Sequence, residues 1–127
     1  MVRKTYRAKN VTESGPYSHA VEADKFIFLS GQTAMNAEKG ESLQGNIAEQ
    51  TKQCFTNLAE VLEAANLTND DVVKVNVYLT DMNHFSSMNE VYKTYFNEPY
   101  PARTCVAVLA LPLGAQVEIE MIAKRKA

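Results

Sequence analysis

The chain has 127 residues, 46% of them hydrophobic and 22% charged, which is typical of one globular domain over residues 1–127. The formal net charge of -2 argues against a nucleic-acid-binding protein, since such proteins usually carry a basic surface. No apolar run approaches the ~18 residues of a membrane helix, and no apolar segment follows Arg3 and Lys4 as in a secretory signal. We therefore expect a cytoplasmic protein that binds neither nucleic acid nor a membrane.

The first third of the chain is predicted to contain three strands separated by loops. Strands are expected over residues 3–7, 17–23 and 26–30, and the last of these is an apolar, aromatic-rich run that follows a tight turn. The stretches 8–16 and 31–45 are rich in Gly, Asn, Ser and charged residues. We expect both stretches to be surface loops.

The clearest helix is predicted over residues 46–65. Its apolar residues recur at spacings near three and four, which places one stripe on Ile47, Phe55, Leu58, Leu62 and Ala65. Asn46 can accept a hydrogen bond from the amide of Glu49, whose side chain can return one, as in a capping box. Asn66 is a suitable residue for a left-handed helix end.

A strand and a second helix are predicted next. The strand covers residues 72–79, and one of its faces consists of Val73, Val75, Val77 and Leu79. The second helix is expected over residues 83–97, with an apolar stripe made of Phe85, Met88, Tyr92, Tyr95 and Phe96. Pro99 and Pro101 end this helix, because proline lacks an amide donor and clashes with the preceding turn.

Two final strands, over residues 103–110 and 116–123, flank a turn that contains Pro112 and Gly114. The order of elements predicts an α+β fold, with one mixed sheet of six strands and two helices on one face. Several strands are apolar on both faces, so a single chain would leave apolar surface in water at ~25 cal/mol per Å². We therefore expect self-association, and the pattern alone does not choose between a dimer and a trimer.

Arg103 is the most informative single residue, because it opens an otherwise apolar strand. A guanidinium cannot be neutralised, so a buried one needs an anionic partner. One interpretation is an ion pair within the chain, to Glu118 or Glu120. The other is a planar fork that binds the carboxylate of a substrate through two parallel hydrogen bonds.

Glu118 and Glu120 lie two residues apart on a predicted strand, so both side chains point to one face. They form either a solvated sheet face or a site at which a carboxylate orients or deprotonates water. If strands 103–110 and 116–123 form a simple hairpin, Arg103 lies ~16 Å from Glu118 along the sheet. The two residues then share a pocket only if the strands are not direct partners or if another subunit intervenes.

Four further residues are candidates for a ligand site. Cys105 shares a strand face with Arg103, where it is either a small buried residue or part of a pocket wall. Tyr17 follows a Gly-Pro turn, Ser30 ends a strand before a glycine, and Asn89 lies within the second helix. Each of these residues also has an ordinary structural interpretation.

The sequence contains no recognisable metal or cofactor motif. Its two cysteines and two histidines lack the Cys-x-x-Cys and His-x-x-x-His spacings of a zinc site. There is also no Gly-rich phosphate loop, no Gly-x-Ser-x-Gly elbow and no acidic metal loop. We therefore expect no metal, no cofactor, and thiols that stay reduced.

Five segments, in the same order along the chain, resemble the RidA family, which is also called the YjgF family. These segments are residues 15–21, 28–32, 73–82, 100–106 and 117–123. The most specific of them contains Pro-Ala-Arg-Thr-Cys-Val. The resemblance runs nearly from end to end.

The resemblance implies a fold and an activity. Family members have a chorismate-mutase-like fold and pack as trimers around a barrel-like core, with the helices outside and ligand clefts between subunits. They hydrolyse 2-imino and enamine acids, such as 2-aminoacrylate, 2-iminopropanoate and 2-iminobutanoate, to 2-keto acids and ammonia. A 2-iminobutanoate/2-iminopropanoate deaminase that forms a homotrimer and binds a small imino or keto acid is therefore expected.

The resemblance also implies roles for single residues. Arg103 matches the arginine that anchors the substrate carboxylate, and Glu118 matches the glutamate that holds the attacking water. Cys105 matches a residue whose main chain touches the ligand. Other residues of the family's cleft are matched by Tyr17, Ser30 and Asn89.

A regulatory or sensor protein that binds 2-keto acids without significant turnover is the alternative interpretation. Arg103 suits a binding protein as well as a catalyst. Glu118 separates the two, because a carboxylate beside a bound anion is useful only if it handles water or protons.

Overall fold

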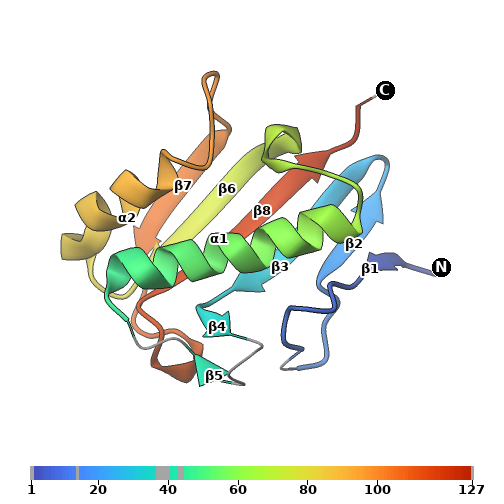
Figure 1. Cartoon of the computed structure of the whole chain (residues 1–127). Helices are drawn as coiled ribbons and strands as arrows, with labels where there is room; N and C mark the ends of the chain where they lie inside the picture. The colour runs from blue at the N-terminus through green and yellow to red at the C-terminus, as the bar shows by residue number, and fades with distance from the viewer. Residues whose placement is uncertain (1, 14, 37–40, 43–44, 127) are drawn as a thin grey trace.

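The computed structural model describes residues 2–13, 15–36, 41–42 and 45–126. Figure 1 shows one sheet with both helices on the same side of it, and the longer helix crosses the central strands. The sheet has six strands, as the sequence predicts, in the order β1-β2-β3-β8-β6-β7. These strands are β1 (Lys4–Tyr6), β2 (Ala20–Ala23), β3 (Phe26–Gln32), β6 (Val72–Leu79), β7 (Ala102–Ala107) and β8 (Val117–Lys124).

The order of the last three strands decides where the candidate residues lie. β6 pairs with β7 in parallel and with β8 in antiparallel orientation, so it separates the two. The simple hairpin considered from the sequence is therefore wrong. The connection between β7 and β8 contains the expected turn, a short 3-10 segment at Pro112–Gly114.

Helix α1 (Ile47–Ala64) begins and ends as predicted. The amide of Glu49 donates a 2.9 Å hydrogen bond to Oδ1 of Asn46, and the amide of Asn46 donates a 3.4 Å bond to Oε1 of Glu49. Asn66, beyond the end of the helix, has a left-handed φ of 60°. Local side chains thus satisfy the first amides of the helix.

Helix α2 (Phe85–Tyr92) is shorter than predicted, and a 3-10 turn at Met82–His84 leads into it. It ends well before Pro99, because the chain tightens after Val91. The amide and hydroxyl of Thr94 both donate to the carbonyl of Val91, at 3.0 and 2.6 Å. Tyr95 still packs on the core, with its ring stacked 4.3 Å from that of Phe55.

The predicted loop over residues 31–45 is wrong in part. Its first two residues end β3, and β4 (Met35–Asn36) pairs with β5 (Glu41–Ser42) as a small second sheet. Residues 37–40 and 43–44 lie outside the described residues.

The predicted surface loop over residues 8–16 has buried anchors, although residue 14 is outside the described part. Ala8 and Val11 are both buried. The amide of Ala8 donates a 3.1 Å hydrogen bond to Nδ1 of His19, whose side chain is 1% exposed. His19 is therefore a satisfied buried residue that holds this loop against the sheet.

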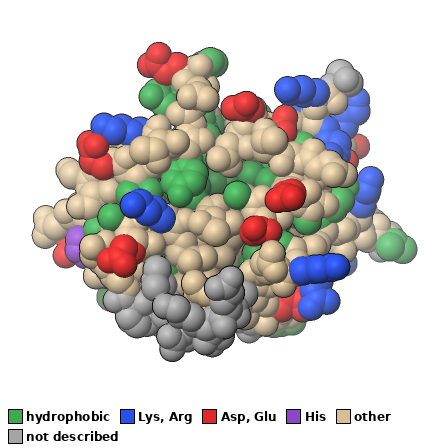
Figure 2. All heavy atoms as spheres, in the orientation of Figure 1, with side chains coloured by type: hydrophobic (Ala, Val, Ile, Leu, Met, Phe, Trp, Pro, Cys, Tyr) green, Lys and Arg blue, Asp and Glu red, His purple; other side chains and the backbone are tan. Residues whose placement is uncertain are grey.

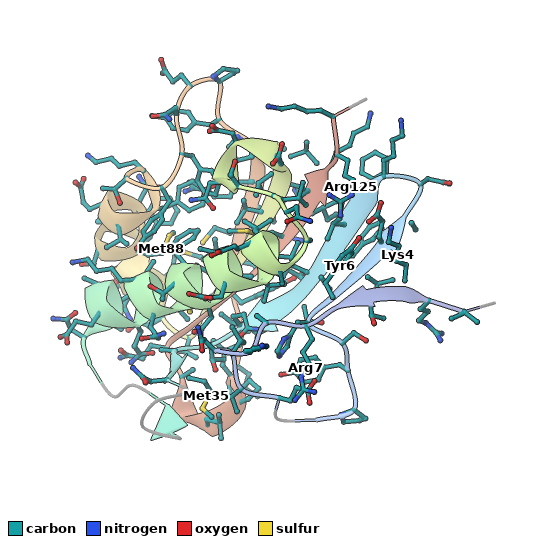
Figure 3. All side chains as sticks on the ribbon, turned by 45° about the vertical axis from the view of Figure 1, so that its right-hand side comes forward. Lys4, Tyr6, Arg7, Met35, Met88 and Arg125 are labelled. Carbon is teal, nitrogen blue, oxygen red and sulfur yellow. The ribbon has the colours of Figure 1, made fainter. Side chains whose placement is uncertain are left out.

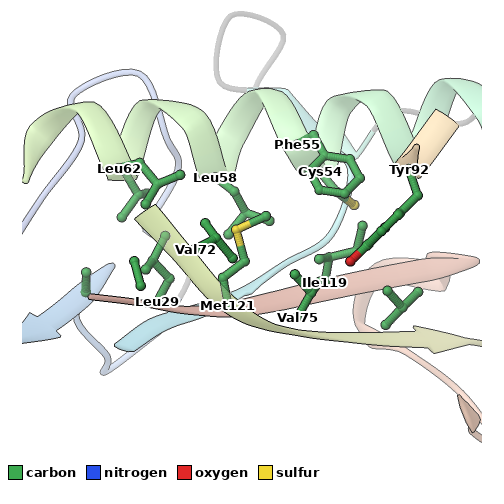
Figure 4. Packing of buried hydrophobic residues seen from close by; sticks show 14 of the residues in the cluster. Leu29, Cys54, Phe55, Leu58, Leu62, Val72, Val75, Tyr92, Ile119 and Met121 are labelled. Atoms are coloured by element: carbon green, nitrogen blue, oxygen red, sulfur yellow. The ribbon is translucent and has the colours of Figure 1, made fainter. Parts of the chain in front are cut away.

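The core lies between α1 and the sheet. Figure 4 shows Phe55 and Leu58 of α1 directed toward Ile119 and Met121 of β8. All four side chains are at most 2% exposed, so they form the continuous apolar layer that holds the helix on the sheet.

The predicted strand face over residues 72–79 is wrong at one position. Val73 is 42% exposed, whereas Val72 is buried. The cause is a shift in the pairing with β8 between Val72 and Lys74. At this shift the regular alternation of buried and exposed side chains is interrupted, and Val73 points to solvent. The other three residues of the predicted face do point to the core.

The opposite face of the sheet, termed here the open face, carries apolar side chains that remain in contact with solvent. Phe28 is 46% exposed and Val106 is 41% exposed, and both helices lie on the other side (Figure 1). On the helix side, hydrophobic side chains gather mainly between the two helices (Figure 2). In the described part of the chain, neither helix has the length and apolar composition needed to cross a bilayer.

Candidate functional site

The candidate residues divide between the two faces of the sheet. Arg103 lies opposite Val75, which is fully buried under the helices, whereas Glu118 lies opposite Tyr78 on the open face. Cross-strand neighbours point to the same side of a sheet. The side chains of Arg103 and Glu118 therefore leave the sheet in opposite directions, and one chain does not bring them into a common pocket.

The first group, termed the arginine half-site, consists of Phe85, Asn89, Tyr92 and Arg103. The Arg103 guanidinium lies 4.6 Å from the ring centroid of Tyr92 and 5.4 Å from that of Phe85. Its Nη1 donates a 2.6 Å hydrogen bond to Oδ1 of Asn89. Two rings and a neutral amide thus hold the cation without cancelling its charge.

The interpretation of Arg103 as part of an internal ion pair is wrong. In the described part of the chain, no carboxylate lies within ion-pair distance of it. The surface beside it is hollowed to about 460 Å³, and the walls of the hollow include Asn89, Tyr92, Tyr100 and Pro101. An anion that enters this hollow meets a cation that is held in position and not yet paired.

Helix geometry explains why these side chains converge. Phe85, Asn89 and Tyr92 are spaced four and three residues apart on α2, which places them on one face above the edge strand β7. From the sequence, Phe85 and Tyr92 are expected only in the apolar core stripe, and their contact with Arg103 was not predicted. Their spacing from Asn89 was the signal that could have linked them to the site.

Cys105 lies two residues after Arg103 on the same face of β7, and its side chain is partly buried. Burial raises the pKa of its thiol, and the nearby Arg103 only partly offsets this. The thiol is therefore protonated at neutral pH and is a poor nucleophile. Cys54 is a buried residue of α1, and desolvation also raises the pKa of its thiol.

The second group, termed the glutamate half-site, consists of Tyr17, Ser30, Gly31, Glu118 and Glu120. These residues line a hollow of about 360 Å³ on the open face. They come from the loop before β2, from the end of β3 and from β8. Four of the five were named from the sequence as site or carboxylate candidates, whereas Gly31 appeared there only as the glycine after Ser30.

Ser30 connects the loop before β2 to the sheet. Its hydroxyl donates a 2.6 Å hydrogen bond to the carbonyl of Ser18, and its amide donates a 2.9 Å bond to the carbonyl of His19. Tyr17 directly precedes this tied segment and is 40% exposed at the rim of the hollow. Ser30 therefore fixes the loop segment from which Tyr17 projects.

Glu118 lies against the backbone of β3. A Cβ placed on Gly31 would come within 2.8 Å of Oε2 of Glu118, so only glycine leaves room for this carboxylate. Burial raises the pKa of Glu118, and the negative charge of Glu120 raises it further. Glu118 is thus a carboxylate with increased affinity for a proton, as a group that exchanges protons with water requires.

The described residues include no cluster of three or more His, Cys, Asp or Glu side chains that could hold a metal ion. What the two half-sites offer is an anchored cation in one hollow and a basic carboxylate in the other.

The sequence pattern of the endoribonuclease L-PSP family matches residues 8–125 of the chain. The chain belongs to this family. The match confirms the resemblance to RidA proteins seen in the sequence, because solved members with the same fold carry that name. Among curated relatives, the 2-iminobutanoate/2-iminopropanoate deaminase of Bos taurus is 47% identical over 97% of this chain and 90% of its own length.

Solved structures of the endoribonuclease L-PSP family agree with the fold. RidA from the Antarctic bacterium Psychrobacter superposes with a TM-score of 0.91 at 41% identity, over 97% of this chain and 100% of that one. E. coli TdcF with bound serine gives a TM-score of 0.90 at 35% identity, over 97% and 99% of the two chains. The α+β arrangement of two helices on a six-stranded mixed sheet is therefore confirmed.

Proposed function

We propose that the protein is a 2-iminobutanoate/2-iminopropanoate deaminase, which hydrolyses 2-imino and enamine acids to 2-keto acids and ammonia. The observation that carries this proposal is the Arg103 cation, held by Asn89 and two rings yet free to bind a carboxylate. Deaminases of this name from cow and mouse are 47% and 48% identical to the chain. In E. coli TdcF, a relative, the bound molecule is serine, a small acid with an α-carboxylate.

The cleft is composite in this proposal. Because the two half-sites lie on opposite faces, the arginine half-site of one subunit completes the glutamate half-site of a neighbour. Such a contact joins two different surfaces, and cyclic symmetry closes it. The exposed apolar side chains of the open face support burial against another subunit, and the family resemblance favours a barrel-like, chorismate-mutase-like homotrimer.

The reaction follows from the chemistry of the two halves. Arg103 binds the substrate carboxylate and orients the imine, which converts a bimolecular encounter into a directed one. Glu118 takes a proton from water as the water oxygen bonds to the imine carbon, and the C=N π pair moves to nitrogen. Glu118 gives that proton to the nitrogen, which yields a carbinolamine.

A second proton transfer completes the hydrolysis. Glu118 carries the carbinolamine hydroxyl proton to nitrogen, the C–N bond breaks, and the C=O bond forms as ammonia leaves. Glu118 returns to its ionised form, so no cofactor is consumed. Tyr17 and Ser30 border this space, Asn89 holds Arg103, and Cys105 contributes its main chain rather than its thiol. The free thiols of Cys54 and Cys105 suit the reducing cytoplasm.

The decisive experiment couples the protein to a pyridoxal-phosphate-dependent serine or threonine dehydratase, which releases enamines as its products. We expect the purified protein to accelerate the appearance of 2-keto acid and ammonia from the released intermediate. If the rate stays at the spontaneous level while the protein still binds 2-ketobutanoate, the sensor interpretation replaces the enzyme.

A further inference from the structure

We propose that Glu120, which accepts hydrogen bonds from Tyr78 and Asn76, is a positioning residue for Glu118. These two hydrogen bonds are termed the clasp. In this proposal Glu120 keeps the Glu118 carboxylate turned into the hollow and makes it a stronger base toward water. The inference rests on the proposed deaminase reaction, in which Glu118 carries two protons from oxygen to nitrogen. It assigns a task to three polar side chains of the open face that the mechanism above leaves unused.

The hydrogen bonds on the open face do not follow the register of the strands. Tyr78 lies directly opposite Glu118, and Asn76 lies directly opposite Glu120. The Tyr78 hydroxyl nevertheless reaches diagonally and donates a very short hydrogen bond to Oε1 of Glu120. Asn76 Nδ2 donates to the same oxygen at 3.2 Å. The Tyr78 hydroxyl therefore bonds to Glu120 and not to Glu118, the residue directly opposite it.

Glu118 makes its contacts on the other side of its strand, toward β3. Its carboxylate leans toward β3, where the missing side chain of Gly31 makes room for it. In the described part of the chain, no side chain donates a hydrogen bond to Glu118. Of the two carboxylates that line the hollow, Glu118 is thus free to bind water, whereas Glu120 is fixed by its two donors.

The clasp also fixes a negative charge. Two donors, Tyr78 and Asn76, bond to one oxygen of Glu120 and hold this carboxylate in place. The hydrogen bond to Glu120, together with burial, raises the pKa of Tyr78 to about 12, so the phenol stays a donor at neutral pH. The negative charge of Glu120 on the same strand face raises the pKa of Glu118 beyond the effect of burial.

Few other charges compete with this effect. The titratable groups that face Glu118 are Glu120 on β8, Tyr78 on β6 and Tyr17 in the loop before β2, and the Cys54 thiol of α1 is buried behind the strand. No Lys, Arg or His is among the described residues that line the hollow. In the proposed trimer, the facing cation is Arg103 of a neighbouring subunit, which binds the substrate carboxylate.

Two substitutions test the clasp. Glu120→Gln keeps an acceptor oxygen but removes the charge, and Tyr78→Phe removes only the donor. For Glu120→Gln we expect kcat to fall about tenfold, since general-base assistance weakens with basicity. Tyr78→Phe should also lower kcat, because Glu120 loses the hydrogen bond that holds it beside Glu118. KM for the imine should stay within about twofold, because Arg103 is unchanged.

The pH profile separates a positioning role from a merely structural one. Glu118 must be ionised to accept a proton, so the rate falls as the pH drops through its pKa. Removing the Glu120 charge lowers that pKa, and the acid limb of kcat should therefore move to lower pH in Glu120→Gln. An acid limb at the wild-type position would overturn the inference.

Tyr6→Phe is a matched control, because it removes the same kind of phenol–carboxylate hydrogen bond elsewhere on the sheet. The Tyr6 hydroxyl donates a 2.6 Å bond to Oε1 of Glu22, beside Arg125, at the β1 end of the sheet (Figure 3). This variant should retain the wild-type kcat and pH profile. If Tyr78→Phe behaves like Tyr6→Phe, the Tyr78 hydrogen bond does not position Glu118, and this part of the inference is wrong.

A measurement without turnover distinguishes failure of this inference from failure of the proposed function. The Glu118 carboxyl signal, assigned with Glu118→Gln, is titrated by carbon NMR in the wild type and in Glu120→Gln. A lower midpoint in the variant supports the coupling, and an unchanged midpoint contradicts it. A wild-type protein that does not accelerate imine hydrolysis contradicts the deaminase itself, whatever the midpoint is.

Discussion

Around Arg103, the hydrogen bond and the two ring contacts in the described structure all come from uncharged groups. Asn89 accepts a hydrogen bond from the guanidinium, and the rings of Phe85 and Tyr92 lie 5.4 and 4.6 Å from it. A neutral environment keeps the full charge available, whereas a neighbouring carboxylate would compete with a bound anion. On the other face of the sheet, the absence of a side chain at Gly31 leaves room for the Glu118 carboxylate.

Arg103→Ala should lower kcat/KM for 2-iminopropanoate about 100- to 1000-fold, since two charge-assisted hydrogen bonds to the carboxylate are lost. The side chain lies in a hollow, so the folded protein and its association state should persist. Steady-state kinetics and analytical ultracentrifugation measure the two outcomes.

Asn89→Asp is the companion variant: it keeps the shape of the side chain but places a negative charge beside Arg103, and it should raise KM. An Asn89→Asp enzyme with the wild-type KM would contradict the role of an unpaired cation.

Gly31→Ala should reduce kcat by about tenfold, because the added Cβ would lie 2.8 Å from Oε2 of Glu118 and would push the carboxylate from its position. Gly15→Ala is the control, since a Cβ there meets Tyr17 only at 3.5 Å, an ordinary contact distance. Kinetics of both variants, with circular dichroism to verify folding, test the prediction. Equal rates for the two variants would show that Glu118 tolerates the displacement.

Among the elements, the two ends of the chain are joined at one edge of the sheet. After β8, the amide of Arg125 donates a 2.8 Å hydrogen bond to the carbonyl of Lys25. The guanidinium of Arg125 donates to both carboxylate oxygens of Glu22 at 3.1 and 3.2 Å, and to the hydroxyl of Tyr6 at 2.8 Å. Figure 3 shows Tyr6 and Arg125 close together there. The hydrogen bonds from Arg125, and then from Tyr6, lower the pKa of Glu22.

The ion pair between Arg125 and Glu22 should make the free energy of unfolding depend on pH in the acidic range. A lowered folded-state pKa contributes stability above the ordinary value of 4.5, and that contribution disappears as the pH falls through the lower folded-state value. Glu22→Gln should therefore lose less free energy of unfolding than the wild type between about pH 5 and pH 3. Urea denaturation over that range measures the difference. Glu13→Gln, which removes an exposed pair with Arg7, should follow the wild-type curve.

For the whole molecule, the arrangement of faces matters more than any single contact. The helices cover one side of the sheet, and the open face keeps Phe28 and Val106 in solvent when the chain is alone. The arginine and glutamate half-sites lie on these two different sides. An assembly that buries the open face would remove apolar surface from water and complete the cleft in one step.

Mixed assemblies test the composite cleft. Arg103→Ala and Glu118→Gln proteins should each be nearly inactive. When they are unfolded together and reassembled in equal amounts, roughly one cleft in four of a random trimer receives both intact halves, so about a quarter of the wild-type activity should return. If both halves came from the same subunit, no activity would return. Reassembly of each variant by itself is the control.

Short-range features of this protein were predictable from its sequence. Asn46 and Glu49 form the capping box, Asn66 adopts the left-handed conformation, and Asp24 and Lys25 make the turn with φ values of 50° and 70°. Each of these depends on atoms a few residues apart, so the local sequence holds all the relevant interactions. The alternation along β8, which separates Glu118 from the buried Ile119, was predictable for the same reason.

Long-range features were decided only by the tertiary structure. The insertion of β6 between β7 and β8, the shift that exposes Val73, and the early end of α2 all depend on which distant segments pair and pack. By itself, the sequence determined most of the elements, the ends of α1 and the residue types at the site. Only the folded sheet decided that Arg103 and Glu118 face opposite ways, because strand order and register are set by contacts between segments far apart in the chain.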